Sequence, residues 1–282
     1  MVEEATAAYN NATYANVTGS EKTALAAAIA AEPSTIAEYE AAVEALNSTL
    51  AAFTAAKTNY DIYATEKALA DAISTDIAGE APTTAAEALA AFKTLKVAEY
   101  NYVATAYPYS ATSKIGEFTS WTRTGTVNGN TKNEFEKLTS QHWSGKAMIY
   151  YEQPADGWNQ SAWTANYTKT TTLPAGNYVI KVAARAATGT ATTAKITCDA
   201  ATLDGPIFNF GDTGKGITTA GVASFDEGEF CNDGNGRGWV WNYLPFTLTE
   251  ETEVTMTVVA EATGTHQWFS VCDGELLSAD NI

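Results

Sequence analysis

Tryptophan side chains are the strongest candidates for ligand contact in this sequence. All seven tryptophans lie beyond residue 108, and Trp158 and Trp163 flank amide side chains in the stretch YEQPADGWNQSAW, residues 151–163. Sugar rings have apolar C–H faces and rims of hydroxyl groups, so a sugar site combines flat aromatic rings with a few polar groups. The stretch therefore predicts glycan contact through Trp158 and Trp163.

A second aromatic group occurs in WVWNYLPF, residues 239–246. Period-two alternation places Trp239, Trp241 and Tyr243 on one face of a strand and Asn242 on the other. The aromatic row either faces the core between two sheets or forms an open platform for a ligand. Arg185 lies opposite the apolar face of its own strand, where it pairs with a surface carboxylate or with a ligand hydroxyl. Trp239, Trp241, Asn242 and Arg185 complete the predicted ligand-binding set.

Catalytic motifs are scarce. The two histidines are 124 positions apart and neither belongs to an HExxH motif, which removes the usual ligands of a zinc hydrolase. The GxSxG nucleophile motif is absent, and Asp212-Thr213-Gly214 lacks the second copy that an aspartic protease requires. A carboxylate pair for glycoside hydrolysis stays open, since the two acids can come from anywhere in a fold. The available acids are Glu152, Asp156, Asp226, Glu227, Glu229 and Asp233.

Oxygen ligands for a calcium ion are dense in FDEGEFCNDGNG, residues 225–236. Calcium binds carboxylates and turn carbonyls, but the spacing does not match an EF-hand loop. The three cysteines, Cys198, Cys231 and Cys272, allow at most one disulfide bridge and fit no two-plus-two metal spacing. The sequence thus offers a structural calcium as its one candidate ion and no other cofactor.

The chain is acidic, with 16 basic and 33 acidic residues among 282 and a net charge of −17. This charge repels phosphate backbones and anionic lipids, which disfavours nucleic acid and membrane surfaces as partners. No run approaches the roughly 18 apolar residues that span a bilayer, and the first residues lack the features of a signal peptide. Either the protein is intracellular or a leader is missing from this sequence. A neutral glycan suits the charge best.

The elements that position these residues differ between the two ends of the chain. Residues 1–107 hold 33 alanines, two glycines and no tryptophan, a composition typical of helices. Apolar stripes at steps of three and four predict helices after Ser20, after Pro33-Ser34 and after Thr83 or Thr84. Residues 61–78 form a further helix or continue the second one. The sequence therefore predicts an antiparallel helical bundle over residues 1–108.

The second part reads as β-structure. Alternation and turn residues predict strands at 146–152, from Tyr178 onward, and at 191–198, 239–248, 253–260 and 267–272. Several short strands with glycine-rich turns and no helical pattern between them predict an antiparallel β-sandwich over residues 115–282. The fold class is thus α + β, in two domains.

Three stretches of the second part carry a family resemblance: YYEQPADGW, YTKTTTLPAGNYVIKVAARA and the closing HQWFSVCDGELLS. Through them the sequence resembles the galactose-binding-like jelly-roll modules of surface and secreted proteins of gut Bacteroidetes. The resemblance covers roughly residues 115–280, and AEYEAAVEALNSTLAAF resembles the small helical bundles that often precede such modules.

The resemblance implies carbohydrate binding outside the cytoplasm, at the cell surface or in a secreted protein, with a leader missing from this sequence. It also implies a structural calcium, with Asp273 at the matching position of the last strand. The resulting hypothesis is a non-catalytic protein that binds a polysaccharide or oligosaccharide through its sandwich, the bundle acting as spacer or docking domain. The alternatives are a structural or adhesive protein that binds another surface protein, and a glycoside hydrolase. Buried tryptophans favour the structural alternative, whereas tryptophans that line a groove favour glycan recognition.

Overall fold

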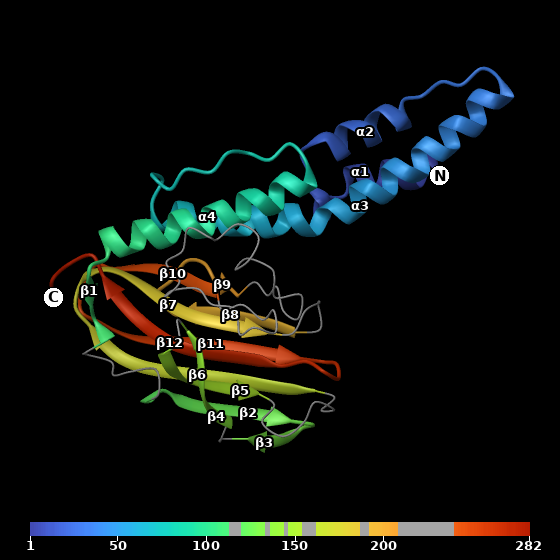
Figure 1. Ribbon diagram of the computed structural model, residues 1–282. Coiled ribbons are helices and arrows are strands. Elements are labelled where there is room, and N and C mark those ends of the chain that lie inside the picture. The colour runs from blue at the N-terminus through green and yellow to red at the C-terminus, as the bar shows by residue number, and fades with distance from the viewer. Residues whose placement is uncertain (113–119, 133–135, 144–145, 154–161, 187–191, 208–239) are drawn as a thin grey trace. The chain divides into compact units, whose positions relative to one another are not determined.

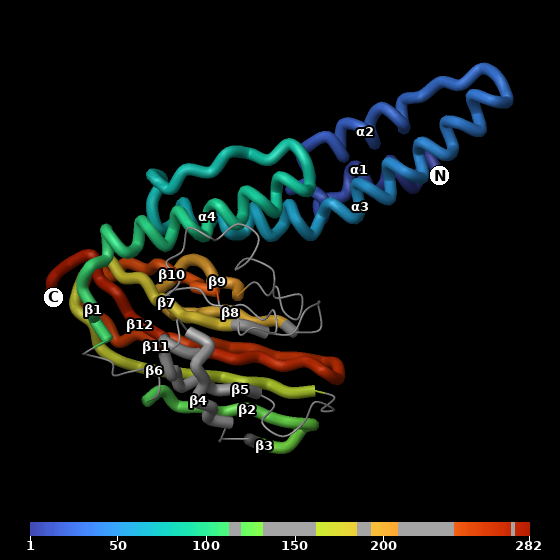
Figure 2. Tube along the Cα trace, viewed as in Figure 1, coloured from blue at the N-terminus to red at the C-terminus, as the bar shows by residue number. Residues whose placement is uncertain are grey.

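Figures 1 and 2 show a computed structural model, which describes residues 1–112, 120–132, 136–143, 146–153, 162–186, 192–207 and 240–282. The chain forms two compact units: the first is Met1–Ala68 with Ala78–Leu95, and the second is Leu69–Ile77 with Lys96–Ile282. The second unit therefore contains helical residues that the sequence places in the bundle. The physical reason is that two long helices run through the boundary without a break.

The first unit is helical, as the alanine-rich composition predicts. Within residues 1–112 the helices are α1 (Val2–Asn10), the 3-10 helix η1 (Ala12–Tyr14), α2 (Ser20–Ile29), α3 (Ile36–Ile73) and α4 (Ala85–Ala106). Residues 61–73 continue α3, which decides the alternative that the sequence left open. No glycine or proline occurs between Pro33 and Gly79, so neither of the two residue types with the lowest helix propensity interrupts this helix. The antiparallel bundle arrangement stays a prediction.

Capping boxes start the two long helices. At α3 the Glu38 carboxylate accepts the backbone N–H of Thr35 at 3.0 Å, and the Thr35 hydroxyl accepts the N–H of Glu38 at 3.3 Å. At α4 the Glu87 carboxylate accepts the N–H of Thr83 at 2.8 Å, and the Thr84 hydroxyl accepts the N–H of Glu87 at 3.1 Å. These bonds satisfy N–H groups that have no partner inside a helix.

A close approach at Gly19 joins α2, α3 and the start of α4. A Cβ atom at Gly19 would overlap the Tyr60 hydroxyl and the Thr83 carbonyl. Beside it, the Glu21 carboxylate accepts the N–H of Ala85 at 2.8 Å and the hydroxyl of Tyr60 at 3.2 Å. Glycine is the residue that permits this packing distance.

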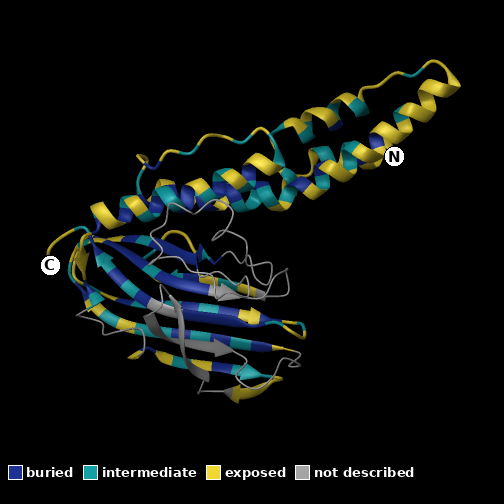
Figure 3. Ribbon diagram, viewed as in Figure 1, coloured by how far each residue is buried: buried dark blue, intermediate teal, exposed yellow. Residues whose placement is uncertain are grey.

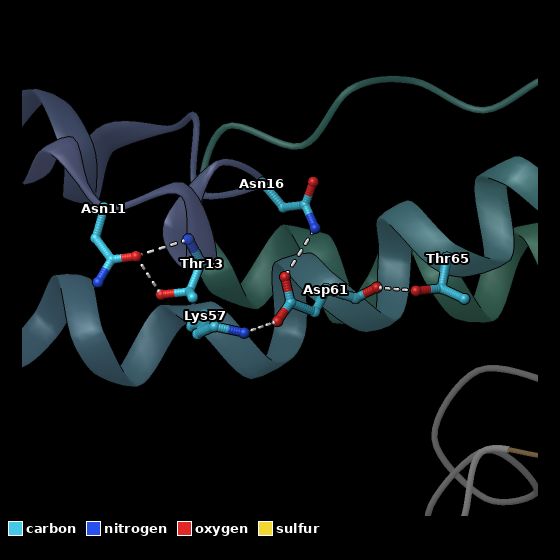
Figure 4. A network of polar contacts seen from close by, with 6 residues as sticks. All are labelled: Asn11, Thr13, Asn16, Lys57, Asp61 and Thr65. Carbon is cyan, nitrogen blue, oxygen red and sulfur yellow. Dashed lines mark hydrogen bonds and ion pairs between the residues drawn. The ribbon is translucent and has the colours of Figure 1, made fainter. Parts of the chain in front are cut away.

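A polar cluster on the surface joins η1 and the turn after it to α3 (Figure 4). Asn16 donates from its Nδ2 to Asp61 at 2.8 Å, and Lys57 forms an ion pair with the same carboxylate. Asn11 caps η1 by accepting the N–H of Thr13 at 2.9 Å. Ion pairs this close to the surface contribute little to stability.

The second unit contains two antiparallel sheets, which confirms the β part of the predicted class. In sheet A the order is β10-β7-β12-β5-β4, with β1 beside β12, and in sheet B it is β3-β2-β6-β11-β8-β9. Sheet A consists of β1 (Tyr109–Ser110), β4 (Glu136–Trp143), β5 (Lys146–Gln153), β7 (Gly176–Ala186), β10 (Val240–Leu248) and β12 (Phe269–Ser278). Sheet B consists of β2 (Thr122–Val127), β3 (Asn130–Lys132), β6 (Trp163–Leu173), β8 (Thr192–Cys198), β9 (Gly205–Pro206) and β11 (Thr252–Ala262). The sequence predicted β5, β7, β8, β10, β11 and β12 and missed the others.

The main core lies between the two sheets and is built from alternate residues of each strand (Figure 3). In β10, β7 and β11 the core residues are Leu244, Phe246, Leu248, Tyr178, Ile180, Val182, Val254, Met256 and Val258. Tyr178 and Phe246 stack with their ring centroids 5.1 Å apart. Successive side chains of a strand point to opposite faces, so the residues between these core positions must point away from the core.

The outer face of sheet A is covered by the C-terminal part of α4, which belongs to the same unit. Val179, Ala183, Trp241 and Tyr243 lie on this face and are at most 4% exposed. The ammonium group of Lys96, in α4, lies 5.2 Å from the centroid of the Tyr243 ring. A helix thus buries a sheet face that the sequence alone treats as open or as core.

Candidate functional site

Several strands that adjoin the candidate residues in the sequence end at the same end of the sandwich. In sheet A, Phe269 at the start of β12 pairs with Gln153 at the end of β5 and with Ala186 at the end of β7. In sheet B, Ala262 at the end of β11 pairs with the first residue of β6. Because only residues 263–268 connect Ala262 to Phe269, both sets of strand ends lie at the same end (Figure 1). We call this end, defined by Gln153, Ala186, Ala262 and Phe269, the rim.

Three predicted ligand residues are neighbours, in the sequence, of strand ends that form the rim. Trp158 lies in the connection between β5 and β6, and Trp239 directly precedes Val240, the first residue of β10. Arg185 pairs with Ser270 across β7 and β12. Trp158, Trp239 and the side chain of Arg185 lie outside the described residues, so the structure gives the strands that flank them and not their positions.

Trp163 lies in the core instead of on a ligand surface. It is 1% exposed, and its indole Nε1 donates to the carbonyl oxygen of Gln267 at 2.9 Å. Stacking on a sugar requires an open ring face, so this burial does not fit the predicted role of Trp163. The physical reason is the parity of β6, in which Trp163, Ala165 and Tyr167 share the core side.

Trp241 is placed by the structure on neither of the two surfaces that its sequence pattern allows. Trp241 and Tyr243 point away from the core between the sheets, but Trp241 is only 4% exposed. The Lys181 ammonium lies 3.9 Å from the Trp241 ring centroid and 5.8 Å from that of Tyr100 in α4. Glu275 completes the group with an ion pair to Lys181 at 3.3 Å. This arrangement does not fit an open platform for a glycan.

Asn242 is also buried, on the core side of β10. It pairs with Val182 in the register and is 2% exposed. Its side-chain Nδ2 donates to the carbonyl oxygen of Val240 at 2.8 Å. Its Oδ1 is buried and has no hydrogen-bond partner among the described residues. The burial of the amide on the core side of the strand does not fit the predicted contact with a ligand.

Sequence reasoning missed the described residues of the rim. Asn128 and His266 are non-glycine residues with positive φ, at 49° and 61°. Asn128 connects the β2–β3 turn to β6, since its N–H donates to the carbonyl oxygen of Ala162 at 2.8 Å. The dipeptide Asn128-Gly129 is a hairpin signal and could have revealed β2 and β3. No comparable signal marks His266.

The residues predicted to bind calcium lie wholly or partly outside the described residues. Asp273 lies in β12 where the pairing register shifts between Cys272 and Glu275, and its side chain is outside the described residues. The acidic segment 225–236 is outside them as well. Among the described residues, no group of three or more His, Cys, Asp or Glu side chains could hold a metal ion.

Of the residues proposed for other chemistry, Cys198 is described. It is buried and forms no disulfide bond, and burial raises the pKa of its thiol to about 11. A thiol that stays protonated is a poor nucleophile and a poor metal ligand. Cys231 and the side chain of Cys272 lie outside the described residues. Of the acids considered for glycoside hydrolysis, Glu152 lies in β5 but its side chain is outside the described residues, as are Asp156, Asp226, Glu227, Glu229 and Asp233.

The described helices include none that is both long enough and apolar enough to cross a membrane. α3 and α4 are the longest helices of the described part of the chain. Both contain charged residues.

Comparisons with known proteins give weak likenesses. No protein-family model and no curated protein matches the chain. Among solved structures, the chain is similar to TmCBM61 in complex with beta-1,4-galactotriose, with 14% identity over 58% of this chain and 91% of that one, and a TM-score of 0.36. It is also similar to the C-terminal family 22 carbohydrate-binding module of Clostridium thermocellum Xyn10B, with 16% identity over 64% and 98% of the two chains and a TM-score of 0.29. Both neighbours are carbohydrate-binding modules, but at these scores they do not identify a ligand for this chain.

Proposed function

We propose that the sandwich binds a polysaccharide or an oligosaccharide, without catalysis, through side chains at the rim. The jelly-roll, galactose-binding-like topology, a location outside the cytoplasm and a spacer or docking role of the helical unit belong to the same proposal. So does a structural calcium ion at Asp273. The ligand-binding residues in this proposal are Trp158, Arg185 and Trp239.

One observation carries this proposal: the pairing of Phe269 with both Gln153 and Ala186. This register brings the ends of β5 and β7 together at the start of β12. Trp158 follows β5 within five residues, and Arg185 is the penultimate residue of β7. Aromatic and guanidinium groups supplied at one edge of a rigid sandwich are the combination that a sugar ring requires.

Charge supports a neutral ligand. The chain carries a net charge of −17, which opposes polyanions and does not affect uncharged glycans. The proposal therefore favours a neutral polysaccharide over an acidic one.

Affinity electrophoresis against a panel of neutral and acidic polysaccharides tests the proposal. We expect at least one neutral glycan to retard the protein, and Trp158→Ala and Trp239→Ala to reduce the affinity about tenfold or more, in line with the loss of a buried aromatic anchor. The matched control is Tyr109→Ala, which removes an aromatic side chain that is 41% exposed and lies in β1, away from the rim. Absence of retardation by every glycan, or equal loss from the control, would overturn the proposal.

A second candidate function is a structural or adhesive protein that binds another protein. It is favoured by the burial of every tryptophan whose side chain is described. These are Trp121, Trp163, Trp241 and Trp268, which are 1% to 6% exposed. Buried rings stabilise the fold and contact no ligand. Failure of the glycan panel together with normal folding would leave this candidate in place.

A further inference from the structure

The first turns of α3, residues 36–45, form a helical surface with no packing partner among the described residues. Every residue of this segment is exposed except Ala42, which is half-buried. Three of these residues have large apolar side chains: Ile36 is 80% exposed, Tyr39 58% and Val43 47%. We call this segment the α3 tip.

The three apolar side chains lie on one face of the helix. Their spacing of i, i+3 and i+7 places them within a narrow arc, because each residue of an α-helix advances by about 100°. This spacing is the one used by helices that anchor in the groove of a partner. Single exposed apolar residues are common on protein surfaces, but an aligned set of three indicates an interaction surface.

The α3 tip is held in helical form before any partner binds. Its capping box is extended by Ser34, whose N–H and hydroxyl donate to the Glu38 carboxylate at 2.8 and 2.7 Å. These bonds fix the first turn, which is the costly step of helix formation. A partner therefore need not supply the free energy that orders this segment.

The negative charge of the α3 tip limits the kinds of partner that can bind it. Between Lys22 and Lys57 the sequence contains no basic residue and four acidic ones, Glu32, Glu38, Glu40 and Glu44. A second copy of this surface would bring like charges together, and an anionic lipid surface would be repelled. A partner with basic residues beside an apolar stripe complements both features.

We propose that the α3 tip binds an amphipathic helix with basic flanks, supplied by another protein. Ile36, Tyr39 and Val43 insert into the apolar stripe of that helix, and the flanking Glu40 and Glu44 carboxylates pair with its lysines or arginines. The binding mode is helix against helix, with coiled-coil-like packing. This surface belongs to the first unit and is independent of the proposed glycan site.

The test uses the full chain and a synthetic, fluorescently labelled peptide of three heptads, with leucine at positions a and d and lysine at e and g. Anisotropy titration should show binding to the wild type. Ile36→Ser/Val43→Ser, which leaves the charge unchanged, should weaken binding about tenfold or more, since each aliphatic anchor loses its buried contact. A peptide with glutamate at e and g should bind at least about tenfold more weakly than the lysine peptide.

Controls separate a site from general attraction to an acidic protein. Glu40→Gln/Glu44→Gln should weaken binding more than Glu250→Gln/Glu251→Gln, which removes the same charge elsewhere. The proposal is overturned if the lysine peptide does not bind, if Ile36→Ser/Val43→Ser leaves binding unchanged, or if Glu250→Gln/Glu251→Gln weakens binding as much as Glu40→Gln/Glu44→Gln does. Self-association of the wild type that Ile36→Ser/Val43→Ser abolishes would also overturn it, in favour of a second copy as the occupant. Circular dichroism of each variant establishes that the helices remain formed.

Discussion

The ammonium group of Lys181 lies 3.9 Å from the centroid of the Trp241 ring, on the outer face of sheet A. The same group forms an ion pair with Glu275 and lies 5.8 Å from the centroid of the Tyr100 ring in α4. A cation over an indole face is attracted by the quadrupole of the ring. Lys181 therefore occupies the ring face that a sugar would need, and it links the sheet to the helix above it.

Trp241→Ala is expected to destabilise the protein without a specific effect on glycan affinity. Loss of a buried tryptophan costs about 3 to 5 kcal/mol of unfolding free energy, which urea denaturation measures. Trp158→Ala should show the reverse pattern, with reduced glycan affinity and little change in stability. Loss of affinity from Trp241→Ala at unchanged stability would show that Trp241 contacts the ligand.

Helices and strands could be predicted from the sequence because the local residue preferences agree with the elements that form. Alanine content gave the helices, and the absence of glycine and proline from residues 34–78 allows α3 its 38 residues. Alternation gave six strands. It did not give β6, in which Lys169 and Thr171 stand on the same face as Trp163, Ala165 and Tyr167 and interrupt the apolar alternation.

The candidate site could be predicted less well, because alternation separates two faces and does not say what covers each. In β10 the row with Trp241 appeared to have two possible environments, core or solvent, yet the end of α4 covers it. Asn242 shares its face with Leu244, so its burial follows from the neighbours across the sheets. The packing of a helix against a sheet leaves no periodic pattern in the sequence of the strand, so alternation cannot reveal it.

Lys96→Met should reveal the cost of an uncompensated buried charge. Lys96 and Glu99 form an ion pair at 3.2 Å, with side chains that are 2% and 1% exposed. Removing one partner of such a pair costs about 3 to 5 kcal/mol, whereas replacing both with apolar residues is often neutral. Urea denaturation should therefore show a large loss for Lys96→Met and recovery of most of it in Lys96→Met/Glu99→Leu.

The exposed pair of Lys57 and Asp61 provides the control for that experiment. Its side chains are 35% and 31% exposed, and such surface pairs contribute about 0 to 1 kcal/mol. Lys57→Met should therefore change the unfolding free energy far less than Lys96→Met. If both variants lowered the unfolding free energy equally, burial of the Lys96 ion pair would add no cost to its loss.

Gly19→Ala should destabilise the helical unit more than Gly79→Ala. A Cβ at Gly19 meets the backbone carbonyl of Thr83, which cannot move without shifting the chain before α4. A Cβ at Gly79 meets the end of the Leu95 side chain at 2.9 Å, which can rotate away. We expect a loss of about 1 to 3 kcal/mol for Gly19→Ala, the usual cost of overpacking. Equal thermal stability of the two variants would show that the chain relaxes freely at Gly19.

Acid should weaken the contact of Glu21 with Ala85. Partial burial raises the pKa of Glu21, but hydrogen bonds from the Ala85 N–H, the Tyr60 hydroxyl and the side chain of Ser20 outweigh it and hold that pKa below 4.5. A lowered pKa in the folded state gives stability that is present above the unfolded value and is lost as the pH falls through the folded value. The stability of Glu21→Gln, measured by urea denaturation, should depend less on pH below about 4.5 than that of the wild type. Glu44→Gln, at an exposed carboxyl of α3, is the control and should follow the wild type.

Alkali should act on the same hydrogen bond through Tyr60. Burial and the negative charge of Glu21 raise the pKa of Tyr60 to about 12 from 10.0. Because the protonated phenol is favoured in the folded state, its contribution is complete below pH 10 and is lost as the pH rises through about 12. Tyr60→Phe should remove this alkaline loss, and Glu21→Gln should lower the pKa of Tyr60 by removing the adjacent charge. Because the chain has 14 tyrosines, the titration of Tyr60 is obtained as the difference in phenolate absorbance between each protein and the same protein with Tyr60→Phe. An unchanged titration of Tyr60 in Glu21→Gln would show that burial alone sets its pKa.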